Sequence, residues 1–348
     1  MKSDPTNISD RKKEHLDLVL NRFVNFEKKT NGFESYDFIH YALTEVDINK
    51  IDLSIKFLGK RISYPFLISS MTGGTNYAND INAQLAIMAN ELNIPIGVGS
   101  QRQSLVNNRH QYSFKIIRKN APKVPVLANI GAAQVVEYTG IDNYKKIIDD
   151  VSANGLIIHL NPLQELLQVN GQTNFNGLLN KISDLCEKLP VPVLVKEVGA
   201  GISKKAAKKL LDVGVKAIDI AGAGGTSWAG IELMRNSQKS NNSFWDWGLP
   251  ASYCIKTVKQ LKKKYGFTLI ASGGISNGFD IAKALALGAD ITASAKTVLK
   301  FLDKKGIDKT IQLIIDWHET LKKIMFLTGA QNLKQLNHKK LIKVNKLY

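Results

Sequence analysis

One pattern of hydrophobic and polar positions repeats along the chain from residue 65 onward. Each repeat has a short apolar run, then a turn rich in Gly, Asn or Ser, then apolar positions spaced as on an amphipathic helix. Strands that alternate with helices indicate right-handed βαβ units and a parallel sheet. The eight predicted strands are PFLISS (65–70), IPIGVGS (94–100), PVLANIG (125–131), GLIIHLN (155–161), VPVLVKEV (191–198), KAIDIAG (216–222), TLIASGG (268–274) and DITASA (290–295). The predicted helices include residues 75–92, 176–189, 203–214 and 277–288.

Eight such units over about 250 residues match a (β/α)8 TIM barrel of the α/β class. We therefore predict one domain with an N-terminal extension. Residues 65–330 form the barrel, residues 1–64 form an arm and extension that contribute to the substrate site, and residues 331–348 form a basic, solvated tail. A doubly wound open sheet is the alternative. It has less support, because no G-x-G-x-x-G motif is followed by an acidic residue about 20 positions later.

Composition and charge narrow the classes of partner. The formal net charge is +17, but arginine occurs at only seven positions and the lysines are spread over predicted helix faces. The sequence has no basic stripe interleaved with aromatic residues, so we expect no nucleic-acid partner. No apolar run approaches the ~18 residues that span a membrane, so we expect no membrane insertion. The polar N-terminus lacks a signal-peptide core. Cys186 and Cys254 form neither a metal spacing nor a disulfide framework, which favours the cytoplasm.

The predicted strands end in polar or glycine-rich residues, and in a barrel these ends surround the active site. The densest example is HLNPLQE (159–165), which places four polar side chains directly after an apolar strand. Each of them alone is as typical of a polar loop or a helix cap as of a binding site. The prediction of a site is stronger because five such side chains fall on the same rim. They are Arg102, Asn129, Gln164, Glu165 and Lys196.

Three glycine-rich loops predict a phosphate-binding site. SGGI (272–275) and SAK (294–296) end the seventh and eighth strands, where barrels commonly bind phosphate through glycine amides and a helix N-terminus. GAGGTSW (222–228) adds a third loop with hydroxyl groups. The set indicates a phosphorylated cofactor and a second phosphate ligand.

Lys196 and Glu165 suggest what else is bound. A lysine at the end of an apolar strand is costly unless it meets an anion. It can form an ion pair with Glu197 or Glu165, a Schiff base, or a contact with a flavin. The flavin is favoured, because no carboxylate set typical of an aldolase accompanies it. Glu165 is a candidate Mg²⁺ ligand, since Mg²⁺ is typically held by one or two carboxylates and by substrate phosphates.

Seven segments, taken together, resemble the type 2 isopentenyl-diphosphate isomerases. The resemblance extends from about residue 11 to about residue 330, with the motifs in order and correctly spaced. The segments are RKKEH (11–15), SSMTGGT (69–75), VGSQR (98–102), HLNPLQE (159–165), VKEVGAGIS (195–203), AGAGGTSW (221–228) and SGGISNGFDIAKALALGA (272–289).

The resemblance implies an FMN-dependent barrel enzyme of isoprenoid biosynthesis that interconverts isopentenyl diphosphate and dimethylallyl diphosphate. It also implies reduced FMN, NADPH as reductant, Mg²⁺, and a homotetramer or homo-octamer. The FMN contacts implied are Ser70, Met71, Thr72, Ser100, Asn129, Lys196 and Thr226, with the flavin phosphate on Gly273, Gly274, Ile275, Ala295 and Lys296. Arg11, Lys12, Ser100 and Arg102 would hold the diphosphate. His159 and Gln164 would face the substrate as catalytic residues, and Glu165 would bind the metal.

The implied chemistry moves one proton onto an alkene carbon and removes another. Reduced flavin stacked on the alkene would stabilise the developing carbocation, and Gln164 would orient or relay the proton.

Two positions depart from the family pattern. Ala221 stands where many relatives have a serine that reaches the flavin. Ser276 stands where many have an arginine near the flavin phosphate, and Lys296 is the candidate to compensate.

Three other functions fit parts of the sequence. An FMN-dependent oxidoreductase of the hydroxy-acid oxidase kind is the nearest alternative, but it should carry a His–Arg pair near the seventh strand, and the sequence has none there. A barrel nucleotide dehydrogenase should have a cysteine after the sixth-strand glycines, where this chain reads GGTSW. A basic nucleic-acid-binding protein would explain only the charge.

Overall fold

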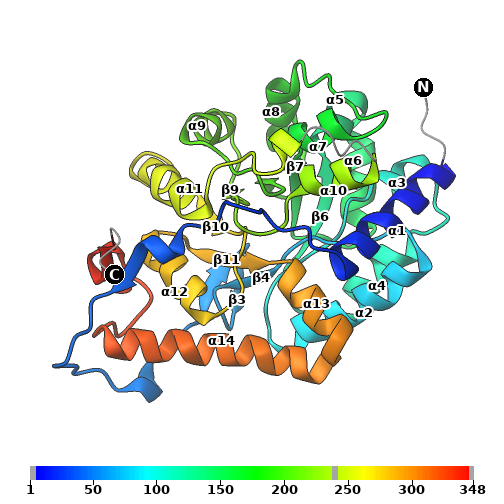
Figure 1. Cartoon of the computed structure of the whole chain (residues 1–348). Helices are drawn as coiled ribbons and strands as arrows, with labels where there is room; N and C mark the ends of the chain where they lie inside the picture. The colour runs from blue at the N-terminus through cyan, green and yellow to red at the C-terminus, as the bar shows by residue number, and fades with distance from the viewer. Residues whose placement is uncertain (1–4, 237–241, 345–348) are drawn as a thin grey trace.

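A closed barrel of eight parallel strands forms the centre of the computed structural model, which describes residues 5–236 and 242–344 (Figure 1). The strands follow one another in chain order, and β11 pairs with β4 to close the barrel. The predicted TIM barrel is therefore confirmed, and each of the eight predicted strands is present. They are β4 (Phe66–Ile68), β5 (Ile96–Gly97), β6 (Val126–Gly131), β7 (Gly155–Leu160), β8 (Val193–Glu197), β9 (Ala217–Asp219), β10 (Thr268–Ala271) and β11 (Ile291–Ser294).

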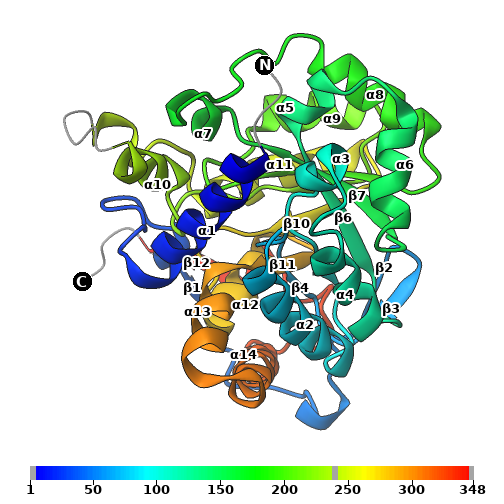
Figure 2. The same ribbon diagram turned by 90° about the vertical axis from the view of Figure 1, so that its right-hand side faces the viewer.

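Helices surround the barrel and connect its strands (Figures 1 and 2). The four helices predicted from periodicity correspond to α2, α8, α9 and α12. α9 illustrates the reason: Ser203 caps its first turn by accepting from Ala206 N, and Leu210 and Leu211 are buried while its lysines are exposed. The helices are α1 (Pro5–Asn21), α2 (Asn76–Glu91), α3 (Arg102–Val106), α4 (Tyr112–Asn120), α5 (Ala132–Glu137), α6 (Ile141–Asp149), α7 (Pro162–Leu167), α8 (Leu178–Lys188), α9 (Lys204–Asp212), α10 (Trp228–Arg235), α11 (Ala251–Val258), α12 (Gly278–Leu287), α13 (Lys296–Lys305) and α14 (Ile307–Leu327).

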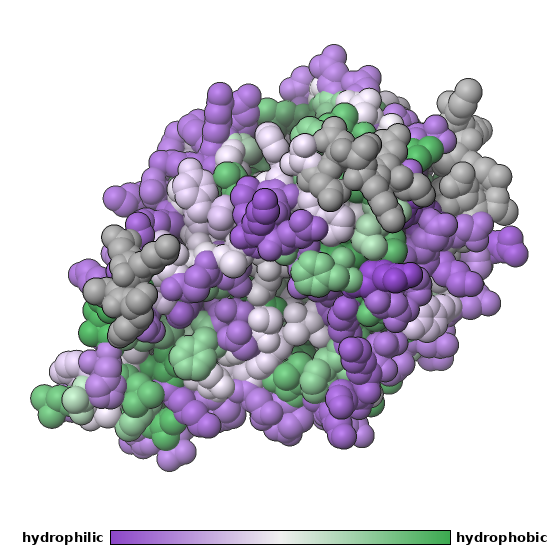
Figure 3. Space-filling model, viewed as in Figure 1, coloured by the Kyte–Doolittle hydropathy of each residue, from purple (hydrophilic) through white to green (hydrophobic). Residues whose placement is uncertain are grey.

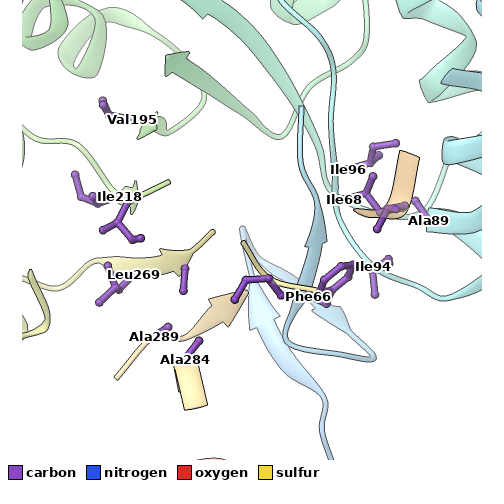
Figure 4. Packing of buried hydrophobic residues seen from close by; sticks show 14 of the residues in the cluster. Phe66, Ile68, Ala89, Ile94, Ile96, Val195, Ile218, Leu269, Ala284 and Ala289 are labelled. Carbon is purple, nitrogen blue, oxygen red and sulfur yellow. The ribbon is translucent and has the colours of Figure 1, made fainter. Parts of the chain in front are cut away.

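The barrel strands alternate between two apolar cores. Outward-facing side chains belong to one core, in which Figure 4 shows Ile68 near Ala89 of α2 and Phe66 near Ile94. Inward-facing side chains, among them Leu127 of β6 and Leu194 of β8, fill the barrel interior. Because successive side chains of a strand point to opposite faces, the residue two positions further along each strand also faces inward, one layer nearer the barrel mouth.

The extension before residue 65 covers both ends of the barrel. The hairpin of β2 (Ile55–Phe57) and β3 (Lys60–Ile62) buries Phe57 and Ile62 against the interior layer. Helix α1 lies at the opposite end, against α3, α10 and α13 (Figure 2). The sequence indicated an arm, but it did not predict that the extension would close both ends.

The described part of the C-terminal tail is paired with the N-terminal extension. β12 (Leu341–Lys343) forms an antiparallel ladder with β1 (Tyr36–Phe38). Ile342 and Lys343 are exposed, as a solvated tail requires, but the backbone pairing was not expected. On the face drawn in Figure 3, hydrophilic residues predominate and hydrophobic ones form separate groups. None of the described helices has both the length and the apolar character needed to cross a bilayer.

His318 of α14 is buried on the outer side of the barrel. Its ring stacks on Tyr64, with 4.1 Å between ring centroids, and its Nδ1 donates to the Ile314 carbonyl at 2.6 Å. Burial lowers the pKa of His318 to about 4, although the bond to Ile314 acts in the opposite direction. The folded protein therefore holds this imidazole neutral at pH values where an unfolded chain would protonate it.

We expect His318 to make the fold sensitive to acid. The folded pKa lies below the unfolded value of about 6.5, so the unfolded chain binds the extra proton and stability falls as pH drops from 6.5 toward 4, by roughly 3 kcal/mol for this group. The free energy of unfolding in urea at pH 6.5 and pH 4.5 measures the effect. His318→Phe should lose less stability than wild type across this interval, whereas the exposed control His40→Gln should lose as much. An unchanged pH dependence in His318→Phe would contradict the assignment.

Candidate active site

One cavity of about 280 Å³ lies at the carboxyl ends of the barrel strands, beneath helix α1. Every residue that the sequence assigned to the site lines it, from segments that are up to 285 positions apart along the chain. These residues are Arg11, Lys12, Ser70, Met71, Thr72, Ser100, Arg102, Asn129, His159, Gln164, Glu165, Lys196, Thr226, Gly273, Gly274, Ile275, Ala295 and Lys296. The structure thus brings the whole predicted set to one place.

Three cations meet where α1 crosses this cavity. Lys12 Nζ donates to the carbonyls of Gly73 at 2.8 Å and Ser100 at 3.0 Å, and Arg11 and Arg102 line the same wall. Burial, and after it the charges of Arg11 and Arg102, lower the pKa of Lys12 to about 7. The pKa of Arg11 is lowered by burial and then by Arg102. A polyanion bound here would reverse these penalties, so the cluster suits a diphosphate.

A hydrogen-bonded series on the strands fixes His159. Gln101 Nε2 donates to the Ile147 carbonyl, and Gln101 Oε1 accepts from Asn129 N at 3.1 Å. Asn129 Nδ2 donates to the Val98 carbonyl, which leaves Asn129 Oδ1 to accept from His159 Nδ1 at 2.8 Å. Burial and then the Lys196 charge lower the pKa of His159 to about 3. His159 is therefore a neutral imidazole with its proton on Nδ1.

Lys196 is held by the backbone. Its Nζ donates to the Glu197 carbonyl at 2.6 Å, while the Glu197 carboxylate turns away and accepts from the N–H groups of residues 198–201. The ion pair with the Glu197 or Glu165 carboxylate that the sequence left open is not formed among the described residues. The neighbouring strand places Asp219 opposite Lys196. Burial raises the pKa of Asp219, and the Lys196 charge opposes that rise.

The phosphate loops have the backbone shape that an anion cradle needs. Gly273 and Gly274 have φ values of +97° and +78°, and a Cβ on Gly273 would lie 1.9 Å from the Gly222 carbonyl oxygen. Ala295 is the N-cap residue of α13 and makes no side-chain cap bond, and the first turn of that helix lines the cavity, so its first amides are available to an anion. Burial and then Lys300 lower the pKa of Lys296 to about 8. Ser276, the second position that departs from the family pattern, donates through its N–H and its hydroxyl to Asp280, each at 2.9 Å.

Several buried polar atoms in the cavity fit a flavin. Within residues 5–236 and 242–344, no hydrogen-bond partner contacts Ser70 Oγ or Gln134 Nε2, and both side chains line the cavity. Buried polar groups are nearly always satisfied, so these atoms are available to a bound group. Ala221 also lines the wall and has a positive φ of 34°. It offers no side-chain hydrogen bond there, as the sequence indicated.

The surroundings of Glu165 fit a magnesium ion shared with a substrate. Its Oε1 accepts from Asn161 Nδ2 at 3.0 Å, and its Oε2 accepts from Gln172 N at 2.8 Å, so a lone pair remains on each oxygen. Asn161 Oδ1 is buried and has no partner within the described ranges. Those ranges hold no group of three or more His, Cys, Asp or Glu side chains placed for a metal. One carboxylate, an amide oxygen and substrate phosphates are the kind of oxygen set that Mg²⁺ uses.

The structure adds a network that the sequence did not reveal. Glu232 of α10 is fully buried, and its Oε1 accepts from Gln164 Nε2 at 3.0 Å and from His15 Nε2 at 2.9 Å. Arg235 donates to its Oε2 at 2.7 Å. Trp228 packs edge-on against His15, with 5.2 Å between centroids. His15 belongs to the segment RKKEH, which was already identified in the sequence. Glu232 lies in an ordinary helical pattern, and only the spacing of an acidic and a basic residue three positions apart could have indicated it.

Comparison with known protein families gives a match over most of the chain. The family model described as FMN-dependent dehydrogenase matches residues 6–121 and 161–343. Named relatives match the chain at 44–46% sequence identity. An isopentenyl-diphosphate delta-isomerase of Chlorobium phaeobacteroides is 44% identical over 97% of this chain and 97% of that protein. The protein of the same name from Nostoc sp. is 46% identical over 97% and 96%, and that from Vibrio parahaemolyticus is 44% identical over 94% and 97%.

Comparison with solved structures gives the same barrel at much lower identity. A doubly substituted flavocytochrome b2 with sulfite bound has a TM-score of 0.69 at 16% identity, covering 97% of this chain and 86% of that one. A mandelate oxidase variant has a TM-score of 0.67 at 14% identity, covering 98% of this chain and all of that one. These similarities establish the fold, but a shared fold does not identify the reaction.

We expect pyrophosphate binding to protonate Lys12. In the free protein its pKa of about 7 leaves the amine mostly neutral at pH 8, and a bound anion raises that pKa again. Calorimetry of FMN-loaded protein with inorganic pyrophosphate at pH 8, in buffers of different ionisation enthalpy, measures the protons taken up. Wild type should take up about one proton more than Lys12→Met, and its affinity should fall as pH rises above 7. The exposed neighbour control Lys13→Met should match wild type. Equal uptake by wild type and Lys12→Met would rule out this role.

Proposed function

The chain belongs to the isopentenyl-diphosphate delta-isomerase family of FMN-dependent proteins, and on that basis we propose that it interconverts isopentenyl diphosphate and dimethylallyl diphosphate. The observation that carries the proposal is the cavity itself. The same cavity is lined by three basic side chains (Arg11, Lys12 and Arg102), by glycine-rich loops, and by polar side chains whose orientations are fixed by hydrogen bonds. A small diphosphate and a phosphorylated flavin are the pair of ligands that this charge distribution suits.

Arg11, Lys12 and Arg102 bind the substrate diphosphate in this proposal, with Ser100 at the same wall. This assignment is supported because burial and mutual repulsion lower the pKa values of Arg11 and Lys12, and a bound anion relieves both effects. Because Arg11 and Lys12 belong to α1, docking of that helix completes the substrate site. Binding energy from the diphosphate then fixes the alkene end of the substrate in the interior, which is how remote groups contribute to reaction at another atom.

FMN occupies the strand side of the cavity. The residues that would hold it are Ser70, Met71, Thr72, Ser100, Asn129, Lys196 and Thr226, with its phosphate on Gly273, Gly274, Ile275, Ala295 and Lys296. When bound and reduced, the flavin supplies an electron-rich ring that stabilises positive charge developing on the alkene. Lys196, with its ammonium fixed by the Glu197 carbonyl, favours the anionic reduced form. Lys296 supplies positive charge at the phosphate in place of the family arginine.

Gln164 and His159 act on the substrate side. Gln164 Nε2 donates to Glu232, so its amide oxygen and second N–H are directed by that bond. Burial alone would raise the pKa of Glu232, but the hydrogen bonds from His15 and Gln164 and the charge of Arg235 lower it. Glu232 is then a carboxylate at neutral pH that can take the Nε2 proton of Gln164 as the Gln164 amide oxygen takes a proton from the substrate. His159 is neutral, so it can face and orient the substrate without adding charge to the site.

Magnesium and a reductant complete the proposal. Glu165 and the amide oxygen of Asn161 would hold Mg²⁺ together with the diphosphate, and the ion would neutralise part of the diphosphate charge. NADPH is the proposed reductant that would supply the reduced flavin, and the isomerisation itself would consume no electrons.

The proposal extends to the state of the protein in the cell. A homotetramer or homo-octamer is the proposed assembly, and exposed apolar side chains such as Phe23, Leu43 and Val169 are available for subunit contacts. A cytoplasmic location agrees with Cys186 and Cys254 both being free thiols. We propose no nucleic-acid partner, because the lysines lie on solvated helix faces such as that of α9.

An anaerobic assay tests the reaction directly. FMN-loaded protein with NADPH, Mg²⁺ and isopentenyl diphosphate should form dimethylallyl diphosphate without stoichiometric NADPH consumption. Gln164→Ala should lower kcat by roughly 10²-fold, a typical loss for a group that assists proton transfer. Gln312→Ala, an exposed glutamine of α14, is the matched control and should leave kcat unchanged. No isomerisation by folded, flavin-loaded wild type would reject the proposal and favour an FMN-dependent oxidoreductase.

A titration with Mg²⁺ tests Glu165 separately. Glu165→Gln keeps the shape of the side chain but loses a charged oxygen ligand, so the Mg²⁺ concentration for half-maximal activity should rise by about 10-fold or more. Glu187→Gln, an exposed position on α8, should keep the wild-type value. A wild-type Mg²⁺ dependence in Glu165→Gln would mean that the ion is held elsewhere.

A further inference from the structure

Arg235 forms ion pairs with two carboxylates on opposite sides of its guanidinium group. At the last residue of α10, its Nη1 lies 2.7 Å from Glu232 Oε2, and its Nη2 and Nε each lie 2.9 Å from Glu14 Oε2. Glu232 belongs to the same helix and is fully buried, whereas Glu14 belongs to α1 and is 59% exposed. One side chain thus joins the substrate-binding arm to the carboxylate that contacts Gln164.

The position of Arg235 matters because of the charge balance at Glu232. Burial lowers the pKa of His15, so His15 is neutral at neutral pH even though its bond to Glu232 opposes that change. Gln164 carries no charge. Arg235 is therefore the fixed cation that contacts this buried carboxylate in the described chain, and a buried carboxylate that loses its cation partner is strongly destabilised.

We propose that Arg235 is a positioning residue for the isomerisation, which holds Glu232 in place so that His15 and Gln164 stay oriented and which fastens α1 to the barrel through Glu14. The proposal rests on the proposed function for the reaction it serves. Arg235 does not line the cavity and touches none of the proposed ligands, so it acts through the residues that it holds.

The arm and the proton-handling residues are coupled by this arrangement. Arg11 and His15 are four positions apart on α1, so they share a face of the helix. A contact that fixes His15 and Glu14 therefore fixes Arg11 and Lys12 over the diphosphate. The same end of α10 also contacts α7, because Nδ2 of Asn236, the residue after Arg235, donates to the Leu167 carbonyl at the end of α7. α10 thus connects the helix that carries the cations to the helix that carries Gln164.

The titratable and charged groups around Glu232 give the expected pH effect its direction. α1 presents Arg11, Glu14 and His15, α7 presents Glu165 beside the neutral Gln164, and α10 itself presents Arg235. The neighbouring turn η3 (Asn242–Phe244) has no charged residue. Removing the Arg235 charge takes away a group that lowers the pKa of Glu232. The acid side of the kcat profile, where Glu232 becomes protonated, then moves to higher pH.

The first experiment compares Arg235→Gln and Arg235→Lys, with Arg22→Gln as an exposed arginine control near the end of α1. In FMN-loaded protein, Arg235→Gln should lower kcat at pH 7 by roughly 10-fold and raise the acid pKa of the profile by about one pH unit. Arg235→Lys should keep most of the wild-type kcat and an acid pKa close to that of wild type, and Arg22→Gln should match wild type. A purely structural role would lower the melting temperature of Arg235→Gln and leave the acid pKa where it is in wild type, and that result would overturn the proposal.

The second experiment isolates the contact with the arm. Glu14→Gln breaks the link to α1 but leaves the Arg235–Glu232 pair, so KM should rise about 3-fold with the acid pKa unchanged. Such a modest change is expected because exposed ion pairs contribute little individually. Asp17→Asn is the matched control: it removes an exposed carboxylate from the same helix, one that bonds to Asn21, and KM should stay as in wild type. An unchanged KM in Glu14→Gln would overturn the fastening role.

A third measurement separates this proposal from the proposed function. Titration of the Glu232 carboxyl by NMR in ¹³C-glutamate-labelled, FMN-loaded protein, assigned with Glu232→Gln, needs no turnover. A higher Glu232 pKa in Arg235→Gln than in wild type supports the positioning role even if the protein isomerises nothing. An equal pKa in the two proteins overturns the role even if wild type is an active isomerase.

Discussion

The alternation of side chains in a closed barrel is the constraint on which the site depends. Leu127, Ile157 and Leu194 fill one interior layer. Two positions further along the same strands, the inward-facing residues are Asn129, His159 and Lys196. A one-residue slip of any strand would turn its polar residue into the outer apolar core and an apolar one into the cavity. The packing that stabilises the barrel therefore also determines which side chains can act on a ligand.

Charge is the second organising factor, and it is arranged unevenly. The wall under α1 gathers Arg11, Lys12 and Arg102, and the two lowered pKa values there record an electrostatic cost in the folded protein. Such a cost is typical of functional sites, where stability is given up for affinity toward a ligand of opposite charge. The strand side behaves differently: His159 is neutral, the Glu197 carboxylate is stabilised by backbone N–H groups, and Lys196 is the cation on the same strands. Net positive charge is thus concentrated where a diphosphate would lie.

The sequence predicted the barrel and its rim because those depend on local patterns. Apolar runs with polar ends located all eight strands, and glycine-rich stretches located the loops proposed to bind phosphate, where the structure gives Gly273 and Gly274 positive φ values. It could not predict contacts that depend on tertiary docking. β1 and β12 pair although about 300 positions separate them along the chain. Glu232 lies in GIELMR, where a glutamate between apolar residues is typical of a helix surface, and only the docked α1 and α7 make it the buried centre of a network.

The division of labour between strands and helices explains how one fold can serve more than one reaction. The barrel strands and their glycine loops form the side of the cavity that suits a flavin, and the same fold recurs in flavocytochrome b2 and mandelate oxidase structures at 14–16% identity. The side that suits the substrate comes from α1, α7 and α10, which lie outside the strand ladder. These helices are joined mainly through side chains, namely His15, Gln164, Glu232 and Arg235. Substrate choice can therefore change through a few helix residues while the strands, which must keep their alternation to stay folded, remain as they are.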